Sequence, residues 1–132
     1  MIPPALVSTG KDDWATPRYI VDWAIAHLGI ARIGFDLDAA ARNKTSKGLH
    51  YFGPGGMCED AFEARWDVSG RGTHVWCNPP YSRAGGGLAR WCARMSDAAA
   101  IEGCTVVGFF FSKTETTAWH DYVSRSSEVF FL

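Results

Sequence analysis

The sequence lacks the patterns that commonly identify a membrane protein, a metal site or a nucleotide-binding loop. In 132 residues, no apolar run approaches the length of a transmembrane helix. The four cysteines are widely spaced and form no Cys-x-x-Cys pair, so we expect no zinc or other metal and predict reduced, mostly buried thiols. Neither Gly-x-Gly-x-x-Gly nor a Walker sequence occurs, which argues against dinucleotide and ATP binding. No signal peptide is recognisable, and we therefore expect a cytoplasmic protein.

An excess of charge of one sign is also missing. The chain has 13 Lys and Arg against 14 Asp and Glu, a net charge of −1. Any contact with nucleic acid must then come from a local cluster of basic side chains rather than from the whole surface. The candidates are Arg83, Arg90, Arg94 and Lys113. A solvated helix face explains each of these arginines equally well.

Length and composition predict one folded domain over residues 1–132. Apolar residues make up 47% and aromatic residues 14% of the chain, enough for a core. Residues 1–11 contain two prolines and a glycine, so we expect a flexible arm there.

Strand and helix patterns alternate along the chain, which predicts an α/β fold with a mostly parallel, doubly wound sheet. The strand expected at 105–111 contains no charged residue and is mostly Val and Phe, as in a fully buried strand. Strands are expected at 33–38, 49–52, 74–78, 105–111 and 128–132. Helices are expected from Pro17 to Gly29, from 88 to about 103, and around 119–123 after a capping box at 112–115.

Two of these helices carry specific expectations. Thr16 is predicted as the N-cap of the first helix, with Pro17 at the first helical position and Gly29 at the C-terminus. Trp14 and Thr16 then either pack and cap, or line a ligand cleft. The apolar face of the second helix is expected to contain Leu88, Trp91, Cys92, Met95 and Ala99.

The stretch 74–81 carries the strongest chemical signal. Its apolar strand must end at Asn78, because the two prolines that follow lack an N–H and stiffen the turn. Asn78 and Tyr81 are then fixed at the mouth of the sheet. The sequence Asn-Pro-Pro-Tyr is typical of enzymes that methylate an exocyclic or amide nitrogen, most often N6 of adenine. An ordinary strand followed by a Pro-Pro turn is the alternative.

The residue types suit that chemistry. The lone pair of an adenine amino group is delocalised into the ring, so the nitrogen is a poor nucleophile. The side-chain oxygen of Asn78 and the carbonyl of Pro79 can each accept one N–H and aim the lone pair at a methyl donor. Tyr81 offers a face on which a flipped base can stack, worth roughly 1–3 kcal/mol.

A second signal lies at the end of the strand 33–38. Asp38 is followed by small residues, which suits a nucleoside cofactor at the carboxyl edge of a sheet, although the acid could instead cap the next helix. Asp38, Asn78 and the pair Ser112–Lys113 all follow predicted strands. Parallel strands bring these positions to one edge, so we expect one site there.

Taken together, these landmarks resemble the phage-type DNA N6-adenine methyltransferase family, over nearly the whole chain and in the same order. The landmarks that carry the resemblance are Trp14 to Pro17, Phe35 to Ala41 with Asn43 and Lys44, Tyr51, Asp60 to Phe62, Trp66, Val75 to Ser82, Trp91 and Thr114 to Trp119. The resemblance implies a Rossmann-like fold, S-adenosyl-L-methionine as cofactor and double-stranded DNA as partner. It also implies a phage or prophage protein in a bacterial cytoplasm.

The resemblance also implies roles for particular residues. The target adenine would be held by Asn78, Pro79, Pro80 and Tyr81. The cofactor would be held by Trp14, Thr16, Pro17, Asp38, Ala39, Ala40 and Asp60. DNA contacts would come from Ser82, Arg83 and Lys113.

The chain departs from the family pattern in two places. The loop 84–87 is richer in glycine than expected after the motif, and family members usually continue with further strands past position 132. We therefore expect a C-terminally truncated sheet whose edge strand, 128–132, is exposed and able to self-associate. Two functional alternatives follow: methylation of a protein glutamine amide, or a remnant that only binds nucleic acid or cofactor weakly.

Overall fold

The structure is a computed structural model of the chain, and it describes residues 16–38, 48–51, 61–79, 87–110, 117–126 and 128–130. Its elements, in order, are α1 (Arg18–Leu28), β1 (Ile33–Asp38), β2 (Gly48–Tyr51), β3 (His74–Asn78), α2 (Gly87–Ala100), β4 (Thr105–Gly108), α3 (Thr117–Asp121) and a 3-10 helix (Val123–Arg125). No helix in these ranges has the length and hydropathy of a membrane span.

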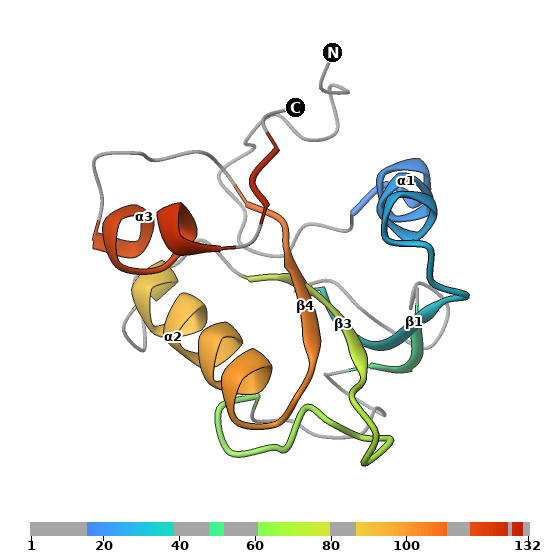
Figure 1. Cartoon of the computed structure of the whole chain (residues 1–132), viewed down its shortest axis with the longest axis horizontal. Coiled ribbons are helices and arrows are strands. Elements are labelled where there is room, and N and C mark those ends of the chain that lie inside the picture. The colour runs from blue at the N-terminus through green and yellow to red at the C-terminus, as the bar shows by residue number, and fades with distance from the viewer. Residues whose placement is uncertain are drawn as a thin grey trace.

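The strands form one parallel sheet in the order β2-β1-β3-β4 (Figure 1). β2 lies on one side of β1, and β3 and then β4 lie on the other side. The register pairs Phe35 with Val75 and Leu37 with Cys77, so these inner-strand side chains point to the same face. The alternation of strand and helix signals therefore predicted the class correctly: the protein is α/β with a parallel sheet.

Helices cover both faces of this sheet: α1 lies on one, and α2 and α3 lie on the other (Figure 1). On the α1 face, the buried cluster consists of Ile20, Val21, Ala24, Ile33 and Trp76. On the α2 face, the core includes Phe35, Leu37, Val75, Cys77, Trp91, Cys92, Met95 and Ala98. The core therefore has two layers, and the inner strands β1 and β3 contribute to both.

The C-terminus of α1 agrees with the sequence, but its N-terminus does not. Gly29 adopts φ 67° and ψ 29°, the left-handed conformation that glycine tolerates, and its N–H bonds the carbonyl of Ala26. The N-cap is Pro17 rather than Thr16, and no side-chain hydrogen bond caps the helix. The prediction of Thr16 as N-cap was wrong by one residue, and its hydroxyl contacts Trp76.

Three further expectations were wrong in the described residues. The strand predicted at 105–111 ends at Gly108, and its residues are half-buried or exposed because β4 forms an edge of the described sheet. Residues 128–130 form no strand, and they lie against α1. On α2, Ala98 is buried and Ala99 is exposed, because the helix turns the position after Ala98 toward solvent.

Cys77, Cys92 and Cys104 carry reduced thiols and are buried, as predicted for them, whereas Cys58 lies outside the described residues. Burial raises the pKa of the Cys92 thiol to about 11 and raises that of Cys104 as well. Neutral thiols are poor nucleophiles, so the side chains of Cys92 and Cys104 act as small apolar core residues.

Candidate active site

The candidate site lies at the carboxyl ends of the two inner strands. β1 ends at Asp38 and β3 ends at Asn78, and these residues are partners in the register of the parallel pair. Neighbouring strands lie about 4.8 Å apart, so the two backbones are adjacent at the edge of the sheet. The strand order reverses between β1 and β3, and open parallel sheets bind ligands beyond such a switch point. The structure thus brings together two residues that the sequence assigned to one site.

Asn78 is the last residue of a strand that is buried on both faces. It is 2% exposed, and Pro79 beside it is also buried. Because an amide carries no charge, burying it costs far less than burying a carboxylate would. Its carbonyl oxygen is a hydrogen-bond acceptor at any pH, which suits the recognition of an N–H group.

Trp76 connects this strand to the segment that precedes α1. The indole Nε1 of Trp76 donates a hydrogen bond of 3.1 Å to Oγ1 of Thr16. Both side chains are buried, and they are 60 residues apart in the sequence. Trp76 also stacks on Phe109, with ring centroids 5.8 Å apart and planes at 29°. Thr16, which the resemblance assigned to the cofactor, therefore lies against the strand that ends at Asn78.

The sequence analysis gave Trp76 and Phe109 no part in this site. The signal for Trp76 was available, because alternation along a strand points residues 76 and 78 to the same face. The contact with Phe109 could not be predicted from the sequence, because it depends on the register between β3 and β4, in which Trp76 pairs with Val107.

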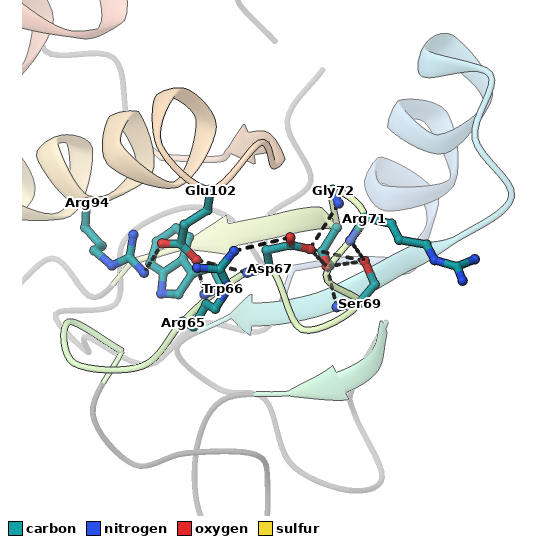
Figure 2. Close-up of polar contacts among 9 residues, drawn as sticks. Arg65, Trp66, Asp67, Ser69, Arg71, Gly72, Arg94 and Glu102 are labelled. Atoms are coloured by element: carbon teal, nitrogen blue, oxygen red, sulfur yellow. Dashed lines mark hydrogen bonds and ion pairs between the residues drawn. The ribbon is translucent and has the colours of Figure 1, made fainter.

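The segment from Ala61 to Asp67 is fixed to α2 and to the turn after it (Figure 2). The indole of Trp66 donates a 2.8 Å bond to the carbonyl of Ala61, and the Trp66 and Asp67 backbone N–H groups donate to Oε1 of Glu102 at 2.7 and 3.1 Å. Arg94 forms an ion pair of 2.6 Å with Oε2 of Glu102 and stacks over the Trp66 ring. These bonds fix the chain directly after Asp60, the acid that the resemblance assigned to the cofactor.

The carboxyl groups of Glu102 and Asp67 have pKa values below the ordinary ones. Burial raises the pKa of Glu102, but bonds from the Asp67 N–H and from Arg94 outweigh it and leave the pKa below its ordinary value of 4.5. Asp67 accepts bonds from Thr73, Ser69 and the N–H of Gly72, which similarly outweigh burial and lower its pKa. Both carboxylates are therefore structural acceptors that fold the loop leading into β3 (Figure 2).

Arg94 was one of the basic residues considered for DNA contact, and the structure gives it a different role. Its side chain is 12% exposed, and its guanidinium bonds Glu102 and the carbonyl of Ala64 at 2.6 and 2.7 Å. Arg90 is exposed and lies 3.8 Å over the Phe62 ring. Arg94 is thus a structural residue, whereas Arg90 remains accessible.

Several predicted site residues lie outside the described part of the chain. They are Trp14, Ala39, Ala40, Asp60, Pro80, Tyr81, Ser82, Arg83 and Lys113. Asp38 is placed by its backbone in β1. The roles assigned to these residues stay predictions.

The described residues also form a hollow at the opposite edge of the sheet, where the strands begin. Its lining includes Arg32, His50, Ser69, Thr73 and His74. The hollow lies near the amino ends of β1 and β3, whereas Asn78 lies at the carboxyl end of β3. It shares no residue with the site predicted from the sequence. Within the described ranges, no three His, Cys, Asp or Glu side chains gather in a way that would hold a metal ion.

The chain is similar to a protein family and to a phage protein. The profile of a family described as DNA N-6-adenine-methyltransferase (Dam) matches residues 5–132. A DNA N-6-adenine-methyltransferase of Escherichia phage T1 is 34% identical over 73 residues, which cover 55% of this chain and 26% of that protein. The match thus spans about a quarter of the length of the curated relative. No solved structure matches the chain significantly.

Proposed function

The chain belongs to the DNA N-6-adenine-methyltransferase family, and we propose that it transfers a methyl group from S-adenosyl-L-methionine to N6 of adenine in double-stranded DNA. The family match and the phage relative favour an adenine amine over a glutamine amide as the acceptor. They also support a phage or prophage protein that acts in the cytoplasm of a bacterial host.

The observation that carries this proposal is the pairing of Asp38 with Asn78 at the switch point of the sheet. A doubly wound sheet in which β1 and β3 are neighbours binds its ligand in the crevice between their carboxyl ends. We propose that the sheet belongs to a Rossmann-like methyltransferase fold, with the cofactor over β1 and the target base over β3.

Asn78 and Pro79 would orient the reacting nitrogen. Oδ1 of Asn78 and the carbonyl of Pro79 each accept one N–H of the adenine amino group, which directs its lone pair away from the strand. The contribution is orientation and electrostatic preorganisation, since neither residue forms a covalent bond. Transfer removes one of the two N–H groups, because the methylated nitrogen sheds a proton to solvent.

The base must leave the duplex to reach these acceptors. Tyr81 would stack on the flipped adenine, and Ser82, Arg83 and Lys113 would contact the DNA backbone nearby. A local cluster of this kind is needed because the chain as a whole carries a net charge of −1.

We propose that residues at the carboxyl end of β1 help to hold the cofactor. When bound, S-adenosyl-L-methionine would supply an electrophilic methyl group for transfer to N6. The backbone of Asp38 ends an inner strand at the edge where such sheets bind ligands, which supports a role for its carboxylate in binding the cofactor's hydrogen-bond donors. Trp14, Thr16, Pro17, Ala39, Ala40 and Asp60 are the other residues proposed to hold it.

Substitution of Asn78 tests this function. Asn78→Ala is expected to abolish methyl transfer to DNA, a loss of at least about a hundredfold, while leaving affinity for S-adenosylhomocysteine nearly unchanged. Asn78→Asp keeps an acceptor oxygen and should retain measurable activity. The assay measures tritiated methyl transfer to DNA, with RNA and a glutamine-containing release-factor-like protein as parallel substrates.

The outcomes separate the alternatives. Methylation of the protein substrate alone would replace the proposed function with glutamine methylation. Cofactor binding without transfer to any substrate would identify a non-catalytic remnant. Wild-type turnover by Asn78→Ala would contradict the role given to Asn78.

A further inference from the structure

We infer that Trp76 is a positioning residue for methyl transfer, because its indole holds the segment at Thr16 and Pro17 against the strand that ends at Asn78. This inference rests on the proposed function, since it assigns that segment to the cofactor. Trp76 would not touch the reacting atoms. It would act through Thr16, and its loss would weaken cofactor binding.

The first support is the buried hydrogen bond itself. Trp76 is 1% exposed and Thr16 is 2% exposed, and Nε1 donates to Oγ1 at 3.1 Å. A buried indole N–H without an acceptor is costly, so the bond constrains both partners. With 2% of its surface exposed, Thr16 would contribute to the cofactor site mainly through the position of its backbone.

The second support is that the position of Trp76 is itself fixed. Its ring packs among Ile20, Val21 and Ala24 of α1 and stacks on Phe109. The N–H of Phe109 in turn donates a 2.8 Å bond to the carbonyl of Cys77. Because the Trp76 ring is held in place, its N–H fixes the position of the segment before α1.

The third support is the location of the contact. Residues 76 and 78 point to the same face of β3, so Thr16 is anchored on the face that carries Asn78. Thr16 and Pro17 are among the residues assigned to the cofactor, so the bond fixes part of the proposed cofactor segment beside the strand that ends at Asn78.

A double-mutant cycle tests the inference. Thr16→Val keeps the shape and removes the acceptor, and Trp76→Phe keeps a ring and removes the donor. Each is expected to raise both the Kd for S-adenosylhomocysteine and the KM for S-adenosyl-L-methionine by about fivefold, with kcat changing less than about twofold at saturating cofactor. The double variant should bind the cofactor no more weakly than the weaker-binding single variant, because both substitutions remove the same hydrogen bond.

Conservative and distant variants serve as controls. Thr16→Ser retains the hydroxyl, so its affinity for S-adenosylhomocysteine should equal that of the wild type. Thr105→Val and Trp23→Phe are matched changes at an exposed strand position and on the outer face of α1, and neither should alter cofactor affinity. Thermal unfolding is measured for every variant.

The results distinguish positioning from stability. If Thr16→Val lowers the melting temperature but leaves the Kd unchanged, or if the two losses multiply in the double variant, the inference is wrong. Coupled losses of cofactor affinity support it, even when the wild-type protein transfers no methyl group to DNA. In that case the proposed function fails and the role of Trp76 as an anchor stands.

Discussion

Asn78 combines a polar functional group with nearly complete burial. It is 2% exposed at the end of an inner strand. A carboxylate there would face a large desolvation cost, which its protonation would relieve. An amide avoids this problem and offers the same acceptor at every pH. The residue type therefore suits both the fold and the proposed chemistry.

Tyr81 follows Asn78 by three residues, and its proposed role can be separated from a structural one. Tyr81→Phe should retain activity and Tyr81→Ala should lose it, because stacking on a flipped base is worth roughly 1–3 kcal/mol. The loss should shrink on mismatched or single-stranded DNA, where less work is needed to extrude the base. Methylation rates on matched oligonucleotides measure the effect. Equal losses on paired and unpaired substrates would show that Tyr81 has only a structural role.

At the level of elements, the segment before β3 depends on a small polar network. Glu102 accepts two backbone N–H groups and pairs with Arg94, and both side chains are about nine-tenths buried. A paired, hydrogen-bonded charge tolerates burial, whereas removal of one partner leaves the other uncompensated. Removal of the charge of either Glu102 or Arg94 is therefore expected to destabilise the segment that leads into β3.

We expect Glu102→Gln to lower the free energy of unfolding by about 1–3 kcal/mol near neutral pH, because Arg94 loses its counterion. The pKa of Glu102 is lowered on folding, so its contribution is full above the ordinary value of 4.5 and is lost as the pH falls through the folded pKa. Urea unfolding from about pH 7 to pH 3 measures both curves.

Glu63→Gln is the matched control for this prediction, since Glu63 is exposed in the same segment. Its stability should follow that of the wild type at every pH. A constant difference between Glu102→Gln and the wild type across the acid range would contradict the assigned role of the carboxylate.

The elements that could be predicted from the sequence are those set by local chemistry. β3 begins and ends where the apolar run and Pro79 place it, and Gly29 ends α1. The extent of β4 could not be predicted, because an apolar run does not reveal that its strand lies at an edge. The hydrogen bond between Thr16 and Trp76 was equally hidden, since its partners are 60 residues apart.

At the level of the whole molecule, the C-terminal segment is attached to α1 by side chains. Glu128 pairs with His27 at 2.8 Å, and the Phe130 ring meets Trp23 and His27 edge-on at 5.1 and 4.9 Å. Exposed apolar groups remain around this contact, because Tyr19 and Phe130 keep 55% and 50% of their surface accessible. Self-association is therefore still expected near this segment, but through side chains and not through a strand edge at 128–130.

Phe130→Ala tests this expectation. The half of the ring that faces solvent is part of the exposed apolar surface, so its removal should weaken concentration-dependent association in sedimentation velocity. Ile101→Ala is the matched control, because Ile101 is 78% exposed after α2 and should not affect association. Loss of the buried half of Phe130 should also lower the melting temperature slightly, so association is compared well below the transition. A wild-type chain that stays monomeric at high concentration, or equal effects of both substitutions, would contradict self-association through this surface.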